Sequence, residues 1–145
     1  MNKADLACKN FSNGLNCAQS ILCAYAPEFS LEHELVLKIA VPFGGGICRQ
    51  GETCGAVSAS LMVIGLKAYD KNANINDAKM HIYEISQKFI AEFKSINNSS
   101  LCKELLGFDF SKPEEASIIK DKKITANLCP KFIRDVCMIL EKINL

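Results

Sequence analysis

The stretch FGGGICRQGETCGAVSASLMVIGLKAY, residues 43–69, decides the fold. Its first part, residues 43–54, is rich in glycine and carries two cysteines. Its second part, from Thr53 to Tyr69, is apolar on nearly every side of a helix, which is typical of a helix in the middle of a bundle. We therefore predict a buried central helix that follows a glycine-rich loop.

The rest of the chain is also predicted to be helical. It has four prolines and little period-2 alternation, while apolar residues recur at helical spacing. Ser30 is expected to cap one helix with Leu35 and Ile39 on its inner face, and Pro130 is expected to open the last one. These further helices are expected over residues 3–11, from Asn16 to Pro27, between Ser30 and Pro42, after the 70–76 loop with Ile82, Ile85, Phe89 and Phe93 inward, over 101–106, after a capping box at 111–114, and over 130–143.

Length and charge bound the class of protein. A chain of 145 residues forms one domain by size, so we expect a single cysteine-rich helical domain over residues 1–145 with an all-α bundle fold. The formal net charge of +1 gives no reason to expect nucleic acid or an anionic membrane as a partner. The uncharged apolar run over residues 53–66 is too short to span a bilayer. Without a secretory leader at the N-terminus, we expect a cytoplasmic protein.

Cysteine is the compositional outlier, with eight residues. Stable disulfides are rare in the cytosol, so these thiols are either inert core residues or functional ones. Four of them, Cys17, Cys54, Cys102 and Cys129, lie in the first turn of a predicted helix, where free amides and the helix dipole favour a thiolate. Cys8, Cys23 and Cys137 are expected in the core. Cys48, in the glycine-rich loop, is an open candidate for a fifth member of the site.

The spacing of the cysteines excludes the simplest thiol sites. The chain has no Cys-x-x-Cys, which argues against a thioredoxin-like dithiol and against an ordinary zinc finger. Any site must therefore be assembled from distant segments. Gly45, Gly46 and Gly55 would let backbone amides approach a bound cofactor closely, or would simply connect two helices. Arg49 could pair with a thiolate or an anionic partner, although a surface position is favoured.

These residues resemble the CGCAxxGCC-motif (C_GCAxxG_C_C) family of redox-active proteins. The resemblance runs over about residues 6–140, and one departure is that Ala59 replaces a glycine of the family pattern. It implies that Cys17, Cys54, Cys102 and Cys129 are the key cysteines. A related module in split-Soret cytochromes is similar and implies an iron–sulfur centre, whereas the absence of Cys-x-x-Cys-His gives no reason to expect covalent haem. The segments that carry the resemblance are 16–20, 43–46, 51–59, 102–107 and 129–131.

Three chemistries stay open at this point. The first is electron transfer by an iron–sulfur cluster, or by zinc or another metal in its place, held by the thiolates of Cys17, Cys54, Cys102 and Cys129. The second is a metal-free dithiol–disulfide redox protein, which would act as a thiol-based oxidoreductase. In it the Cys54 thiol attacks the substrate, and Cys17 or Cys48 resolves the mixed disulfide. The third is a non-catalytic protein that handles a metal or binds a partner. An electron-transfer or transport-associated protein partner fits each of them, and the oligomeric state is not predicted.

Overall fold

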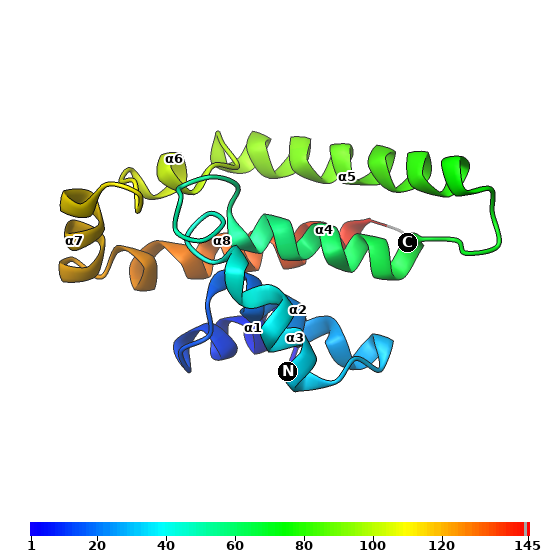
Figure 1. Ribbon diagram of the computed structural model, residues 1–145, viewed down its shortest axis with the longest axis horizontal. Coiled ribbons are helices and arrows are strands. Elements are labelled where there is room, and N and C mark those ends of the chain that lie inside the picture. Colours follow the sequence, from blue (N-terminus) through cyan, green and yellow to red (C-terminus); the bar gives the residue numbers. More distant parts are fainter. Residues whose placement is uncertain (144) are drawn as a thin grey trace.

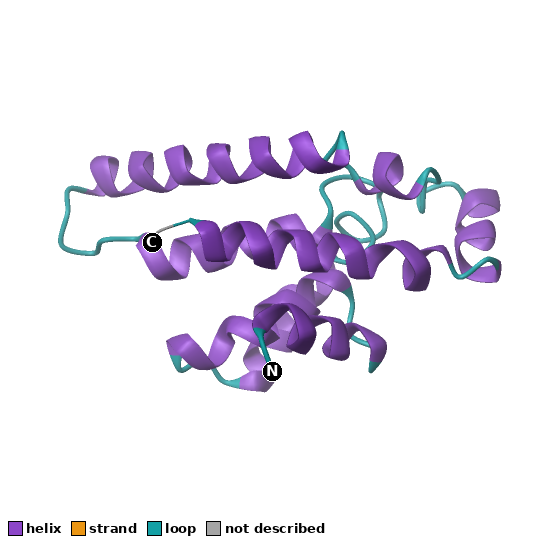
Figure 2. Ribbon diagram, turned by 180° about the vertical axis from the view of Figure 1, so that it is seen from behind, coloured by secondary structure: helices purple, strands orange, loops and turns teal. Residues whose placement is uncertain are grey.

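The computed structural model describes residues 1–143 and 145, and these residues form an all-α fold, as predicted (Figures 1 and 2). Two short 3-10 helices, η1 (Ala26–Phe29) and η2 (Val41–Phe43), join the longer ones. The helices are α1 (Lys3–Ser12), α2 (Cys17–Tyr25), α3 (His33–Ala40), α4 (Gly55–Ala68), α5 (Ile75–Asn97), α6 (Cys102–Leu106), α7 (Pro113–Asp121) and α8 (Ile124–Lys142).

The helix α4 lies at the centre of the molecule, as its sequence predicted. It packs against α2, α5 and α8, so apolar side chains on most of its circumference find a neighbour. Ala56, Val57, Val63 and Ile64 are fully buried. Cys54 is the N-cap residue of this helix, one position later than the cap expected at Thr53. In Figure 1, α4 runs alongside α8, with α5 on one side of the pair and α1–α3 on the other.

The last helix begins earlier than predicted, and Pro130 lies inside it instead of opening it. Lys123 precedes α8 in a left-handed conformation with φ 52°, and the helix then runs without a break through Pro130. A proline inside a helix cannot donate to the carbonyl four residues earlier, here Ala126, so this turn lacks one backbone hydrogen bond. As a consequence Cys129 lies well inside α8, and its predicted place in a first helical turn is wrong.

Further details of the predicted helices are wrong. The capping box expected at 111–114 is absent, because α7 begins at Pro113 and its N-cap residue Lys112 makes no side-chain cap hydrogen bond. Ser30 does not cap α3; it adopts a left-handed conformation, and the helix begins three residues later. On α3, Val36 and Ala40 are buried, whereas Leu35 and Ile39 are 45% and 49% exposed. The short length of α3 explains the error, because eight residues make little more than two turns and allow either face to be chosen.

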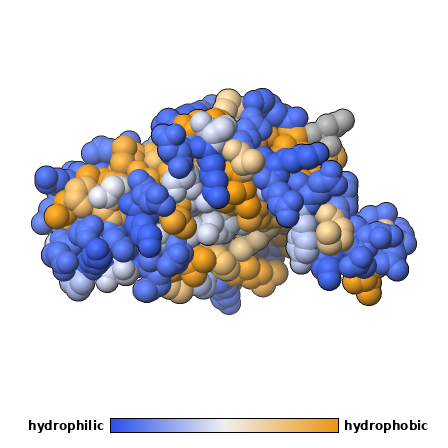
Figure 3. All heavy atoms as spheres, turned by 90° about the horizontal axis from the view of Figure 1, so that it is seen from above, coloured by the Kyte–Doolittle hydropathy of each residue, from blue (hydrophilic) through white to orange (hydrophobic). Residues whose placement is uncertain are grey.

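Ile39, one of the apolar residues that α3 leaves exposed, borders a groove of about 590 Å³ between α3, α4 and α5. Leu66 and Tyr69 of α4 and Tyr83 of α5 line it and are each at least two-fifths exposed. Exposed apolar atoms also appear between hydrophilic ones on the face seen in Figure 3. Over residues 1–143 and 145, none of the helices combines the length and the apolar character needed to cross a bilayer.

Candidate functional site

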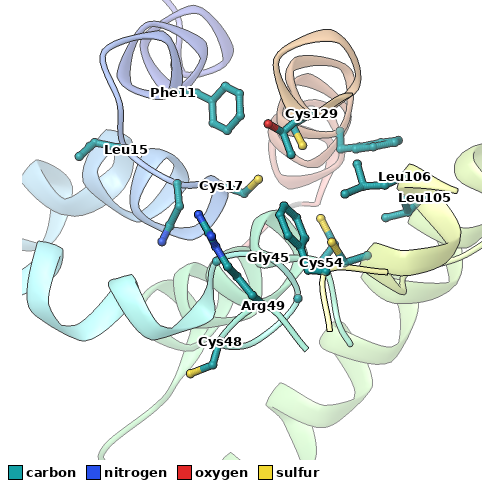
Figure 4. A pocket seen from close by; sticks show the side chains of 18 of the residues that line it. Phe11, Leu15, Cys17, Gly45, Cys48, Arg49, Cys54, Leu105, Leu106 and Cys129 are labelled. Carbon is teal, nitrogen blue, oxygen red and sulfur yellow. The ribbon is translucent and has the colours of Figure 1, made fainter. Parts of the chain in front are cut away.

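A cavity of about 720 Å³ brings together the four cysteines that the sequence singled out. Its walls come from the starts of α2, α4 and α6, from the middle of α8, and from the glycine-rich loop (Figure 4). Cys17, Cys54, Cys102 and Cys129 all line it, and so does Cys48. The other cysteines lie elsewhere: Cys23 and Cys137 are buried in the core, and the Sγ of Cys8 is 3.7 Å from the carbonyl oxygen of Pro130. All eight thiols are free.

Cys17 reaches the cavity because Asn16 starts α2 at this point. The Asn16 side chain accepts a hydrogen bond from the Gln19 amide, and the Gln19 side chain accepts one from the Asn16 amide, which forms a capping box. The Nδ2 atom of Asn16 also donates to the carbonyl of Val41 at 3.0 Å. One residue therefore fixes both the position of Cys17 and the entry to the glycine-rich loop.

Cys54 and Cys102 are placed by a short antiparallel contact between residues 51–54 and 100–103. The Cys54 amide donates to Ser100 O at 2.8 Å, and the Cys102 amide donates to Glu52 O at 2.7 Å. Thr53 and Leu101 form an isolated β-bridge between them. These bonds hold the start of α4 beside the start of α6, although the two are far apart in the sequence. This pairing could not be predicted from the sequence, because neither segment shows the alternation of apolar and polar residues that is typical of a strand.

Glycines let the loop approach the thiols as closely as it does. A Cβ on Gly46 would lie 2.6 Å from the Cβ of Cys102, and one on Gly55 would lie 3.3 Å from the Cβ of Cys17 and 2.7 Å from Phe43 O. Both contacts are too short for an alanine to be accepted without movement. Close approach by the backbone was the role predicted for Gly46 and Gly55, and the structure puts both beside a cysteine. Gly45 also lines the cavity.

Residues 45–49 of the loop form a left-handed turn. Gly45 and Gly46 have φ of 65° and 74°, and Ile47, Cys48 and Arg49 follow with 63°, 51° and 58°. For a residue with a Cβ this conformation costs roughly 1–2 kcal/mol, and a β-branched isoleucine is the least suited to it. The turn is held by backbone hydrogen bonds, including Arg49 N to Gly44 O at 3.0 Å and Glu52 N to Gly46 O at 2.9 Å. Such strain concentrates at functional sites.

The left-handed turn separates the side chains of two adjacent residues. Figure 4 shows the Cys48 sulfur pointing away from the other labelled thiols, whereas Arg49 reaches over the cavity. The Arg49 guanidinium lies 5.4 Å from the ring centre of Phe110, a cation–π contact. Arg49 is on the surface, as favoured from the sequence, and also borders the cavity. Cys48 belongs to the exposed rim and is separated from the four buried or half-buried thiols.

Burial reverses the acidity that the helix starts were expected to give these thiols. It raises the pKa of Cys54 to about 12, although the backbone amides of Val57 and Ala56 at the start of α4 oppose the rise. Burial also raises the pKa of Cys102 to about 12, with Cys54 and Cys17 adding to it. The neighbouring Cys129 thiol, followed by burial, raises the pKa of Cys17 well above its usual value. With their pKa raised in this way, the thiols of Cys17, Cys54 and Cys102 are protonated at neutral pH.

The remaining wall of the cavity is mostly apolar and was not identified from the sequence. Phe11, Leu105, Leu106, Phe110 and Phe132 contribute to it. The sequence signal that would have found Leu105 and Leu106 is their spacing of three and four residues from Cys102, which places them one helical turn further along α6. Phe110 follows the left-handed Gly107 that ends α6, in the part of the chain whose helices were least clear from the sequence.

The donor set fits a cofactor bound by thiolates. Four sulfur ligands from four elements share one cavity, and glycine backbone lies against two of them. Within residues 1–143 and 145, no group of three or more His, Cys, Asp or Glu side chains is arranged so that one metal ion could be held by all of them. The thiols are instead distributed around the cavity wall. A metal at this site stays a prediction.

A comparison with protein families identifies the chain over most of its length. The family model described as "Putative redox-active protein (C_GCAxxG_C_C)" matches residues 15–143, which include all four cysteines of the cavity floor and walls. The comparisons with curated proteins and with solved structures found no match.

Proposed function

The chain belongs to the C_GCAxxG_C_C family of redox-active proteins, and we propose that it transfers electrons through an iron–sulfur cluster bound by Cys17, Cys54, Cys102 and Cys129. The observation that carries the proposal is that all four thiols line one cavity although they come from four separate helices. Four cysteines are the ligand number for a two-iron or a four-iron cluster.

The electrostatics of the cavity favour a bound cation. Burial makes an isolated thiolate costly here, as the raised pKa values of Cys54 and Cys102 show. A metal centre removes this cost, because its positive charge stabilises the thiolate and the ligand deprotonates on binding. The backbone amides of Val57 and Ala56 lower the pKa of Cys54, and amides that donate to ligand sulfurs tune the potential of a cluster.

The distribution of the thiols favours a cluster over a single zinc ion. Four ligands of one zinc ion must all lie about 2.3 Å from it. In a four-iron cluster each thiolate binds its own iron, and in a two-iron cluster two thiolates bind each iron, so the four sulfurs do not all surround one metal ion. Thiols spread over the wall of a cavity of about 720 Å³ correspond better to the second arrangement.

Different residues of the cavity would orient the ligands, exclude water and face a partner protein. When bound, the cluster supplies one-electron chemistry. The capping box of Asn16 orients Cys17, and the bridge between residues 51–54 and 100–103 orients Cys54 and Cys102. Buried Cys129 and Phe132 keep water from the inner wall. Exposed Cys48 and Arg49 mark the side that is open to solvent, where an electron-transfer partner protein would approach.

The proposal is tested by anaerobic purification, followed by a visible absorption spectrum and analysis of iron, sulfide and zinc on the same sample. We expect a brown protein with stoichiometric iron and sulfide. Cys54→Ala should lose the iron and the colour. Cys23→Ala is the matched control, because Cys23 is also buried and lies on the same helix as Cys17, but outside the cavity. Equal iron in both variants, or a wild-type protein that stays colourless after reconstitution with iron and sulfide, would refute the proposal.

One observation favours the dithiol alternative, though with a different pair of cysteines. The Cys129 thiol is the first cause of the raised pKa of Cys17, which pairs these two thiols, whereas the sequence suggested Cys54 with Cys17 or Cys48. Oxidation of this pair would form one S–S bond and release two protons and two electrons. The raised pKa of Cys17 makes it a slow nucleophile at neutral pH, so we rank this reading second. A reversible disulfide in metal-free protein, found by mass spectrometry, would support it.

The third interpretation is a protein that handles a metal without redox turnover. It uses the same four ligands, and electrochemistry distinguishes it from the electron-transfer proposal. A reversible one-electron wave from the loaded protein supports electron transfer, whereas bound metal that shows no wave supports handling. We propose the cytoplasm as the compartment, because a reducing environment keeps all eight thiols free.

A further inference from the structure

We propose that the cavity also binds a small organic anion, with its acidic group at Arg49 and an apolar body directed toward the thiols. The inference extends the proposed function and rests on it for the idea that the thiols form the reactive end of the cavity. Under this proposal, the protein binds a small organic anion next to its redox centre.

The first support is the size and composition of the cavity. Its volume of about 720 Å³ lies in the range of sites for small molecules. The buried thiols of Cys54, Cys102 and Cys129 lie at the inner end of the cavity, whereas Arg49 lies at its exposed rim. The cavity is also lined by apolar and aromatic side chains, including Phe11, Leu15, Leu105 and Phe110. Such walls bind the apolar body of a ligand.

The second support is the charge of the cavity. Among the described residues that line it, Arg49 is the only one with an ionisable side chain other than the cysteines. Within residues 1–143 and 145, no carboxylate forms an ion pair with Arg49 at 4.0 Å or less, whereas the other arginine, Arg134, is paired with Asp5 at 2.8 Å. A guanidinium left without an acidic partner at the edge of an apolar cavity matches a ligand with a carboxylate, sulfonate or phosphate group.

The third support is the arrangement of exposed and buried residues. Arg49, Pro42 and Ala126 are exposed and form the rim, while Cys54, Cys102 and Cys129 are buried. A ligand that pairs with Arg49 at the rim must therefore extend inward past the aromatic wall to reach the sulfurs. The left-handed turn holds the Arg49 backbone, and Phe110 holds its side chain by a cation–π contact at 5.4 Å. Both fix the guanidinium before a ligand arrives.

The test measures the binding of two matched probes by isothermal titration calorimetry. Anilinonaphthalene sulfonate has an apolar aromatic body and one anionic group, and N-phenylnaphthylamine has the same body without the charge. Arg49→Asn removes the guanidinium, and asparagine tolerates a positive φ better than other residues with a Cβ. We expect the Kd of the sulfonate to rise about tenfold in this variant, the low end for a charge-assisted pair. The Kd of the uncharged probe should change less than about twofold.

Control variants locate the effect. Arg134→Gln removes the same charge from the surface of α8 and should leave both Kd values within about twofold. Arg49→Lys keeps a charge at the rim and should keep most of the affinity. Leu66→Lys changes the apolar groove between α4 and α5, outside the thiol cavity, and should also have no effect. If Arg49→Asn does not fold by circular dichroism, Arg49→Gln takes its place.

Two results would overturn the proposal: a sulfonate affinity that does not depend on Arg49, or one that is lost in Leu66→Lys and thus belongs to the groove. The titration is run on protein with and without iron and sulfide reconstitution, which separates this proposal from the previous one. Failure to take up iron with an intact dependence on Arg49 would refute the cluster alone. Stoichiometric iron without that dependence would refute the organic anion alone.

Discussion

Gly46 is the single residue on which the shape of the thiol cavity depends most directly. It combines a positive φ of 74° with contact to both Cys102 and the backbone of Glu52. We expect Gly46→Ala to lower the free energy of unfolding by about 3 kcal/mol, from left-handed strain and overpacking together. Gly65→Ala is the control, because Gly65 lies within α4 with nothing within 4 Å of an added Cβ. It should gain about 0.5–1 kcal/mol. Urea unfolding measures both, and equal effects would contradict the packing described.

The raised thiol pKa values predict how the stability of the metal-free protein changes with pH. Burial raises the pKa of Cys54 and Cys102 to about 12 and that of Cys137 to about 11. A raised pKa means that the folded state keeps the proton longer than the unfolded chain, whose thiols titrate near 8.5. Stability from these thiols is thus complete below about pH 8.5 and is lost as pH rises toward 11–12. We expect a loss on the order of 1 kcal/mol per buried thiol per pH unit in that window.

Urea unfolding of metal-free protein at pH 7.5, 9 and 10.5 measures this loss. Cys54→Ala should show a shallower decline than the wild type, because one of the titrating thiols is gone. An identical decline in both proteins would show that the Cys54 thiol does not contribute.

At the scale of single residues, the sequence predicted the roles that follow from a residue's own side chain and its immediate neighbours. Asn16 is a cap by its own side chain, and glycine beside cysteine indicates close approach. It did not predict the left-handed conformations of Ile47 and Arg49, since local preference disfavours them and only the surrounding hydrogen bonds hold them. The raised pKa values were also missed, because helix starts can be located in a sequence whereas burial around a sulfur cannot.

Among the elements, α8 differs most from its prediction, and Pro130 is the reason. The sequence signal of a proline at the start of a helix is sound on average, yet here six residues of the helix precede it. The apolar face of Phe132, Val136 and Leu140 is long enough to stabilise the helix through packing, and this packing outweighs the missing hydrogen bond. The short helices α3 and α7 were less predictable, since few residues define their faces and caps.

Pro130→Ala restores the amide that the carbonyl of Ala126 lacks. We expect the free energy of unfolding to rise by about 1–2 kcal/mol, less than the full cost of a helix-interior proline because the unfolded chain also gains freedom. Pro130→Gly restores the same amide and should gain about 1 kcal/mol less. Chemical denaturation compares the three proteins. A loss of stability in Pro130→Ala would mean that the fold around Cys129 depends on the proline ring.

For the whole molecule, the proposed cluster joins helices that lie far apart in the sequence, from α2 near the N-terminus to α8 near the C-terminus. Its binding free energy therefore adds to the stability of the fold. At a free ligand level of about 100 times Kd this is about 2.7 kcal/mol, which corresponds to a Tm about 10 °C higher for the loaded protein. Calorimetry of the reconstituted and metal-free wild type measures the difference. Cys54→Ala serves as the control and should melt at one temperature after either treatment.

The all-α class and the central α4 were predictable because hydrophobic periodicity decides both. The meeting of Cys17, Cys54 and Cys102 was predictable from their places near helix starts and from the family resemblance. For Cys129 only the resemblance was a sound guide, because this residue lies inside α8. The size of the cavity and its aromatic wall were not, since they depend on how α6 and the segment around Phe110 fold back over α8. No pattern within any single segment contains that information.

Because the four thiols are far apart in the sequence, they are synthesised at different times during translation. A ribosome makes Cys17 first and Cys129 last, with α4 and the whole of α5 in between. The earlier cysteines therefore spend most of the synthesis without their fourth companion. The proposed cluster would lack its fourth ligand until α8 has been made and has packed against the other helices, so iron would be loaded after translation.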